Sequence, residues 1–140
     1  MYRGNVAAAV RIRREIISRM REQARITPDD ECCGLLAGRD GIITRVLPAR
    51  NALDSATAYE IAPEELFRLM RQIRAEKLEM MGIYHSHPRG ENRPSARDIE
   101  CSCYPEAAYF ILSPLADAAQ AVRAFSIRDG CVAELKIEIS

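Results

Sequence analysis

Two histidines, the only ones in the 140-residue chain, stand two positions apart as His85 and His87. They follow an apolar run over residues 80–84 that is typical of a β-strand. Residues i and i+2 of a strand point to the same face, so both imidazoles are expected to project into one space. Pro88 then takes the chain out of the strand and into a loop. Because imidazole nitrogen is a preferred ligand of zinc, the pair indicates a metal site.

Asp98 is the candidate third ligand. It lies eleven residues after His87, beyond a polar loop over residues 89–94 and on the first turn of a predicted helix. This loop is long enough to fold the carboxylate back over the end of the histidine strand. Two neutral imidazoles and one carboxylate around Zn²⁺ leave a fourth position for water, whose pKa the metal can bring to about 7. The sequence therefore favours a catalytic zinc site.

Ser95 and Glu31 each have a structural and a chemical interpretation. Ser95 and Asp98 form the pattern of a capping box, with serine at the N-cap and an acid three residues later. That structural role is favoured locally, and it is compatible with catalysis because it holds both side chains near the histidine strand. Glu31 directly precedes an apolar strand predicted over residues 32–37, and its structural interpretation is a solvated charge at the strand end. A zinc hydrolase also needs a general base, which Glu31 provides if its strand lies beside the histidine strand.

The order and spacing of these residues resemble the JAMM/MPN+ motif of zinc metalloproteases, E…H-x-H-P-x₆-S-x₂-D. Every defining position is filled, by Glu31, His85, His87, Ser95 and Asp98. The resemblance extends from about residue 9 to residue 113. It is closest to the compact prokaryotic members, because the loops of this chain leave little room for the insertions of the larger eukaryotic enzymes.

The resemblance implies a role for each position. His85, His87 and Asp98 would coordinate one Zn²⁺ ion. Glu31 would act as general base on the zinc-bound water and then protonate the leaving amine. Ser95 would donate a hydrogen bond to the oxyanion of the tetrahedral intermediate.

The resemblance also implies a substrate and a fold. The reaction would be hydrolysis of the bond after the C-terminal Gly-Gly of a ubiquitin-like or sulfur-carrier β-grasp protein. It would either release the modifier from a lysine or trim residues beyond its Gly-Gly. The fold would be a single α/β (mixed α+β) domain over residues 1–140, with a mixed β-sheet flanked by helices and related to the cytidine deaminases.

Hydrophobic periodicity predicts elements that agree with this fold. Helices alternate with strands early in the chain, whereas the later strands are joined by turns. Asp40-Gly41 and Asp129-Gly130 are typical of hairpin turns. The predicted helices cover residues 12–26, 63–77 and 95–103. The predicted strands cover residues 6–10, 32–37, 42–47, 58–62, 80–84, 109–112, 122–128 and 132–139.

Composition excludes several classes of function. The chain has 20 basic and 20 acidic residues, a net charge of zero and no block of five like charges, which argues against a nucleic-acid-binding arm. No apolar run approaches the ~18 residues of a membrane span, and the first 20 residues lack the apolar core of a signal peptide. The five cysteines are an odd number without a repeating framework, which favours a reducing, cytoplasmic location.

Two other functions remain open. Relatives of the family that lack the zinc ligands act as non-catalytic interaction scaffolds, although the complete ligand set here argues against that role.

The pairs Cys101/Cys103 and Cys32/Cys33 suggest thiol-based metal or redox chemistry as the second alternative, but neither pair has C-x-x-C spacing. Residues i and i+2 diverge by about 200° on a helix, and neighbours on a strand face opposite sides. Most of the cysteines are therefore expected to be buried small residues, although one near the zinc would make activity redox-sensitive.

Overall fold

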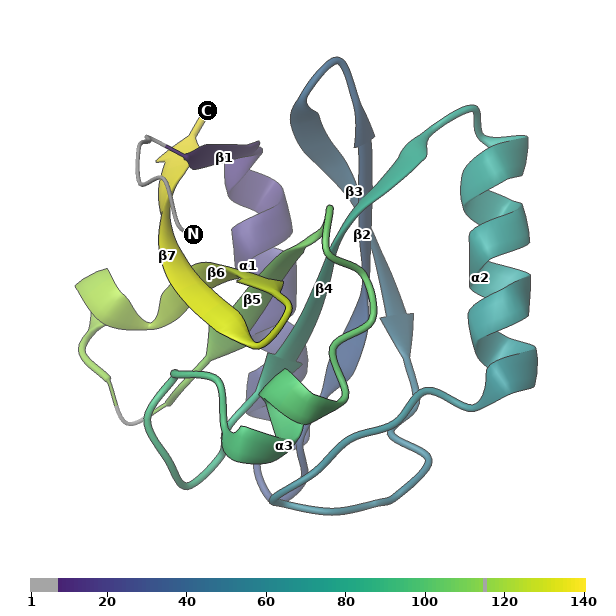
Figure 1. The fold of residues 1–140 in the computed structure, drawn as a ribbon. Coiled ribbons are helices and arrows are strands. Elements are labelled where there is room, and N and C mark those ends of the chain that lie inside the picture. The colour runs from purple at the N-terminus through teal and green to yellow at the C-terminus, as the bar shows by residue number, and fades with distance from the viewer. Residues whose placement is uncertain (1–7, 115) are drawn as a thin grey trace.

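The computed structural model describes residues 8–114 and 116–140. Within these residues, seven strands form one mixed sheet in the order β1-β3-β2-β4-β5-β6-β7 (Figure 1). β1 pairs in parallel with both β3 and β7, so the sheet closes into a barrel. The strands are β1 (Ala9–Ile12), β2 (Cys33–Arg39), β3 (Ile42–Ala49), β4 (Glu79–Ser86), β5 (Ala108–Leu112), β6 (Val122–Arg128) and β7 (Cys131–Ile139). The helices are α1 (Arg14–Ile26), α2 (Pro63–Ala75), the short α3 (Ala96–Glu100) and the 3₁₀ turn η1 (Ala118–Gln120).

Helices cover both faces of the sheet, as expected for the mixed fold. Ile16 and Met20 of α1 pack into one hydrophobic core, whereas Leu69 and Ile73 of α2 pack into a second. Figure 1 shows α1 and α2 on either side of β2, β3 and β4. Alternate side chains of a strand enter the two cores, because the pleat sends successive residues to opposite faces. No helix in the described part of the chain is long and apolar enough to cross a membrane.

The histidine strand β4 lies in the middle of the sheet. It pairs antiparallel with β2, which places Cys33 opposite His85, and parallel with β5. Its end is held on both sides, since the Ser86 amide donates to the Cys32 carbonyl at 3.0 Å and the His87 amide donates to the Leu112 carbonyl at 2.8 Å. The Ser86 hydroxyl also accepts a hydrogen bond from the Cys32 amide at 2.9 Å. β4 therefore runs two residues beyond its predicted end at residue 84, and its pairing fixes the backbone of His85.

Both predicted hairpin turns are confirmed. Asp40 and Gly41 have φ values of 57° and 78°, and Asp129 and Gly130 have φ values of 50° and 78°. Positive φ at both central residues defines the type I′ turn, whose twist matches that of the flanking strands and which favours Asp-Gly. The hairpins β2–β3 and β6–β7 follow from this local chemistry.

Three predicted elements differ most from the structure, beyond shifts of one or two residues at the ends of others. Residues 58–62 form no strand, because the backbone of Ala58 and Glu60 bonds to the side chain of Asn51 rather than to a neighbouring strand. The predicted helix 95–103 ends at Glu100, and Pro105 disfavours helical backbone in the residue before it. The predicted strand 6–10 is shifted to β1 (Ala9–Ile12), while residues 6 and 7 lie outside the described residues.

The pairing of β2 with β4 depends on Gly34, which lies opposite Tyr84. A Cβ atom on Gly34 would lie 2.5 Å from the Tyr84 hydroxyl oxygen and 2.6 Å from the Leu47 carbonyl oxygen. The Tyr84 hydroxyl is held in turn by a hydrogen bond to the Gln23 side chain.

We therefore expect Gly34→Ala to lower the free energy of unfolding by about 1–3 kcal/mol, because a buried ring must move to admit the methyl group. Urea denaturation measures this change. A Cβ on Gly90 would meet no atom within 4 Å, so Gly90→Ala is the matched control, with a change below about 0.5 kcal/mol. Equal stability of the two variants would show that the close packing at Gly34 does not constrain the sheet.

Candidate metal centre

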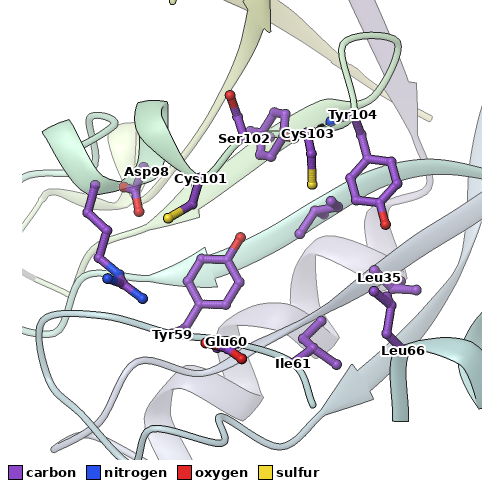
Figure 2. A pocket seen from close by; sticks show the side chains of 13 residues that line it. Leu35, Tyr59, Glu60, Ile61, Leu66, Asp98, Cys101, Ser102, Cys103 and Tyr104 are labelled. Carbon is purple, nitrogen blue, oxygen red and sulfur yellow. Dashed lines mark hydrogen bonds between the residues drawn. The ribbon is translucent and has the colours of Figure 1, made fainter. Parts of the chain in front are cut away.

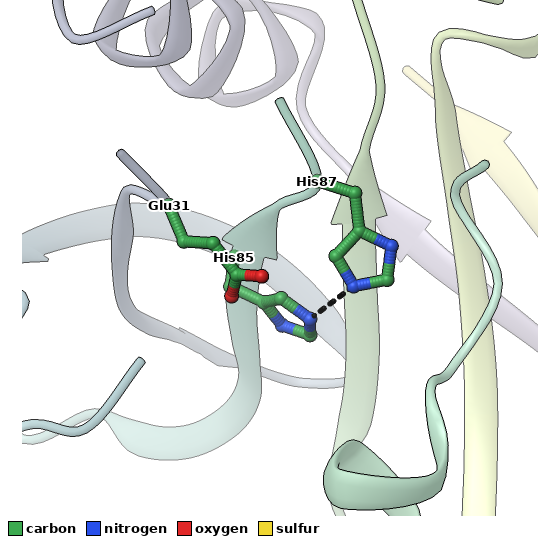
Figure 3. Close-up of side chains that lie close together, drawn as sticks. All are labelled: Glu31, His85 and His87. Atoms are coloured by element: carbon green, nitrogen blue, oxygen red, sulfur yellow. Dashed lines mark hydrogen bonds between the residues drawn. The ribbon is translucent and has the colours of Figure 1, made fainter. Parts of the chain in front are cut away.

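Three side-chain atoms meet at the end of β4. The Nε2 atoms of His85 and His87 lie 3.1 Å apart, and each lies 3.1 Å from Oδ2 of Asp98. Figure 3 shows the two imidazoles turned toward each other from the strand end. His85 is 1% exposed, and the side chains of His87 and Asp98 are 11% and 9% exposed. The structure thus brings together the three ligands that the sequence predicts.

The hydrogen bonds around these atoms leave electron pairs directed at one another. Nδ1 of His87 lies 2.6 Å from the Glu91 carbonyl oxygen, which can only accept, so Nδ1 carries the proton and Nε2 of the neutral ring presents a lone pair. Oδ2 of Asp98 already accepts a hydrogen bond from the Ser95 amide at 2.9 Å. The lone pair of His87 Nε2 and the electron pairs of Asp98 Oδ2 repel each other unless a cation or proton lies between them.

The donor set fits a divalent metal ion. Two imidazole nitrogens and one carboxylate oxygen are a known set of ligands for catalytic zinc. Bonds of about 2.0–2.1 Å at tetrahedral angles place ligand atoms about 3.3 Å apart, close to the sides of the triangle here. The described residues therefore form a site that can hold a metal.

Glu31 lies beside this triangle. A carboxylate oxygen of Glu31 and one ring nitrogen from each histidine all lie within 4.8 Å of one another (Figure 3). The side chain is 4% exposed, and its Oε1 atom has no hydrogen-bond partner among the described residues. The backbone is fixed, because its amide donates to the Ser55 carbonyl at 2.8 Å and its carbonyl accepts from Asn51 Nδ2 at 3.1 Å. The prediction that the Glu31 strand lies beside the histidine strand is confirmed.

The two carboxylates have opposite electrostatic environments. Burial raises the pKa of Glu31 to about 7, against an opposing attraction to His87. Burial also acts to raise the pKa of Asp98, but the adjacent imidazoles of His85 and His87 and the hydrogen bond from the Ser95 amide outweigh it and hold that pKa well below its ordinary value. Near neutral pH, Asp98 is therefore ionised, while Glu31 can both accept and release a proton.

The two imidazoles also differ. Burial lowers the pKa of His85 below its ordinary value, despite the opposing effect of Asp98. Burial acts in the same direction on His87, but the adjacent Asp98 carboxylate and the Glu91 carbonyl raise the pKa overall. His85 is consequently the more firmly neutral of the two, which is the state in which a histidine binds metal.

Ser95 caps the helix that carries Asp98. Its hydroxyl oxygen accepts a hydrogen bond from the Asp98 amide at 3.0 Å, and Oδ2 of Asp98 accepts from the Ser95 amide at 2.9 Å. The predicted capping box is therefore confirmed. Because the hydroxyl acts as an acceptor in this bond, its own proton remains free to be donated elsewhere.

Sequence reasoning missed two residues of this site. The ring of Tyr59 stacks on the imidazole of His85, with centroids 4.5 Å apart and planes inclined by 22°. The buried Asn51 side chain donates to the carbonyls of Glu31, Ser55 and Ala58. Both lie in or next to a loop far from the histidines in sequence, and no local pattern marks them.

A cavity of about 270 Å³ lies beside Asp98 (Figure 2). Its walls are mainly apolar and come from β2, β4, β5, the segment from Tyr59 to Leu66, and the chain after α3. The lining residues include Leu35, Tyr59, Leu66, Ile83, Asp98, Cys101, Cys103 and Tyr104.

The cysteines only partly match expectation. Cys32 and Cys33 are buried, and burial raises the pKa of both thiols, that of Cys33 to about 12. Cys101, Cys103 and Cys131 are exposed, so the prediction that most cysteines are buried is wrong. The first two follow a short helix with no buried residue, and Cys131 directly follows a hairpin turn.

The raised pKa of Glu31 predicts that this residue lowers the free energy of unfolding by an amount that depends on pH. In the unfolded chain Glu31 ionises near its ordinary pKa of 4.5, whereas in the folded chain it ionises only near 7. Between these values the unfolded state binds fewer protons, so this group destabilises the fold progressively as pH rises. We expect Glu31→Gln to gain stability relative to the wild type between pH 5 and pH 8, by up to about 3 kcal/mol. Urea denaturation of both chelator-treated proteins at the two pH values measures this difference, and a pH-independent difference would contradict the assignment.

Comparison with known proteins identifies the family. Residues 13–128 match the family model described as prokaryotic homologs of the JAB domain. The chain is 36% identical over 117 residues to a protein of Haloferax volcanii named desampylase, an alignment that covers 81% of this chain and 84% of the relative. It is 32% identical over 141 residues to the CysO-cysteine peptidase of Mycobacterium tuberculosis, with 99% and 96% of the two chains covered. The solution structure of a Desulfitobacterium hafniense protein superimposes with a TM-score of 0.84 at 30% identity, covering 94% of this chain and 92% of that one. The chain therefore belongs to the prokaryotic JAB-domain family, the JAMM/MPN+ family of peptidases that its histidine motif resembles.

Proposed function

We propose that this protein is a zinc-dependent metallo-(iso)peptidase. Its reaction is hydrolysis of the bond after the C-terminal Gly-Gly of a ubiquitin-like or sulfur-carrier β-grasp protein. The observation that carries the proposal is the 3.1 Å triangle of His85, His87 and Asp98 with the buried carboxylate of Glu31 beside it. The names of the relatives, desampylase and CysO-cysteine peptidase, support this class of substrate.

His85, His87 and Asp98 would hold the zinc ion. When bound, zinc supplies Lewis acidity, which lowers the pKa of water to about 7 and polarises the scissile carbonyl. The ionised state of Asp98 and the neutral state of His85 both suit this role. The hydrogen bond from Nδ1 of His87 to the Glu91 carbonyl keeps Nε2 directed into the site.

Glu31 is the proposed general base. Its Oε1 atom makes no hydrogen bond within the described residues and is free to receive the proton of the attacking water. A base whose pKa is about 7 accepts that proton at neutral pH and can still give it up to the departing amine. The buried position of Glu31 supports this role, because exclusion of water is what raises its pKa.

Ser95 is the proposed donor to the oxyanion. Its lone pair is used by the Asp98 amide, so its O–H can point to the oxygen on which negative charge develops. The capping box fixes the position of the Ser95 hydroxyl oxygen before the substrate binds.

The apolar cavity beside Asp98 is the proposed site for the part of the substrate that flanks the scissile bond. Glycine residues at the bond have no side chains to fill it, so a neighbouring residue of the substrate must do so. The absence of a nucleic-acid or membrane partner and a cytoplasmic location remain predictions from the sequence.

The proposal predicts two different effects of removing a carboxylate. Glu31→Gln is expected to bind one equivalent of zinc but to lose about 100-fold or more in turnover, because only the proton transfer is lost. Asp98→Ala is expected to lose both zinc and turnover. The assay incubates zinc-loaded protein with β-grasp proteins that carry residues beyond Gly-Gly, and mass spectrometry measures cleavage with and without a chelator.

Glu22→Gln is the matched control for this experiment. The Glu22 carboxylate is exposed and pairs with Arg25 on α1, so this variant should cleave at the wild-type rate. Wild-type turnover in Glu31→Gln would show that the base is assigned wrongly. A wild-type protein that binds these β-grasp proteins without cleaving them would identify an interaction scaffold instead.

A further inference from the structure

The buried imidazole of His85 lacks a partner at its second nitrogen. Its Nδ1 atom has no hydrogen-bond partner among the described residues, and the side chain is 1% exposed. A histidine that binds metal almost always donates this second N–H to a carboxylate or carbonyl, which fixes the orientation of its ring. His87 follows this rule through the Glu91 carbonyl, and His85 does not. Some other contact must therefore orient His85.

The ring of Tyr59 contacts the His85 imidazole and can orient it in place of a hydrogen bond to Nδ1. Its ring lies 4.5 Å from the His85 ring, centroid to centroid, with 22° between the planes. A flat stack of this kind restricts rotation of the imidazole about its Cβ–Cγ bond, because the ring faces would separate or collide on rotation.

The backbone around Tyr59 is fixed on both sides by the Asn51 region. Asn51 Nδ2 donates to the Ala58 carbonyl at 2.9 Å, and Asn51 Oδ1 accepts from the Glu60 amide at 3.2 Å. The Glu60 carbonyl accepts a further bond from the Ala52 amide at 2.8 Å. The segment from residue 58 to residue 60 is thus tied down without belonging to the sheet, and its one aromatic ring is held against the histidine.

We propose that Tyr59 is a positioning residue of the metal centre, whose stacked ring holds the His85 imidazole in the orientation that binds the metal. This inference rests on the proposed function, since it takes His85 to be a zinc ligand. It assigns the role to the ring and not to the hydroxyl group, because the ring makes the contact with His85.

Tyr59 also packs against the second hydrophobic core, so positioning has to be separated from packing by experiment. The side chain is only partly buried, and it forms a wall of the cavity beside Asp98 (Figure 2). A residue needed only to exclude water there could be aliphatic, as are Ile61 and Leu66 on the same wall. An aromatic ring adds a flat face to the imidazole that an aliphatic side chain does not offer.

Tyr59→Phe and Tyr59→Leu test the inference by zinc affinity, measured by competition with a chromophoric chelator. We expect Tyr59→Phe to bind zinc as the wild type does, and Tyr59→Leu to bind it about 10-fold or more weakly, as is typical when the support of a ligand is lost. Tyr104→Leu is the matched control, because it removes an aromatic ring from the same cavity while leaving the Tyr59–His85 stack in place. It should keep the wild-type affinity.

A second measurement separates positioning from general loss of structure. The visible absorption spectrum of the Co²⁺-saturated protein reports the geometry of the ligands, and it should change in Tyr59→Leu but not in Tyr59→Phe or Tyr104→Leu. Unchanged zinc affinity and an unchanged spectrum in Tyr59→Leu would overturn the inference, as would an equal loss of affinity in Tyr104→Leu. If the wild type itself bound no zinc, the proposed function would fail first, and that result is distinct from the failure of Tyr59 alone.

Discussion

The structure is organised around three polar atoms that converge on one point. Nε2 of His85, Nε2 of His87 and Oδ2 of Asp98 lie within 3.1 Å of one another in a site shielded from water. Each is held by a different part of the chain. The pairing of β4 with β2 and β5 holds His85, the Glu91 carbonyl holds His87, and the capping box holds Asp98. Because contacts from three parts of the chain keep these atoms together, the site can hold a cation between them.

The surroundings of Asp98 and Glu31 shift the pKa values of these two carboxylic acids in opposite directions. Asp98 lies against both imidazoles and accepts a hydrogen bond from the Ser95 amide, so it stays ionised and suits a metal ligand. Glu31 is buried with an unpartnered oxygen, which brings its pKa to about 7 and suits proton transfer. The difference comes from position alone, since both are ordinary carboxylic acids. Hydrogen bonds to the charged form lower a pKa, and burial without them raises it.

Local chemistry explains which features could be predicted from the sequence. The Asp-Gly hairpin turns, the cap at Ser95 and the shared face of the two histidines each depend on residues close together in the chain. The closing of the sheet through β1 depends on pairing with β7, more than 120 residues away, and no local pattern encodes it. The same holds for Tyr59, whose segment has strand-like composition but bonds to the Asn51 side chain instead of a strand. Contacts that depend on one distant polar side chain leave no periodic signal.

X-ray absorption at the zinc edge tests the central claim most directly, because it identifies the atoms around the ion without reference to activity. We expect one zinc per chain surrounded only by nitrogen and oxygen at about 2.0–2.2 Å, with the multiple-scattering pattern of two imidazoles. Asp98→Ala should abolish this signal, whereas Cys101→Ser should leave it unchanged. A sulfur neighbour at about 2.3 Å in the wild-type protein would place the metal among the cysteines and contradict the account.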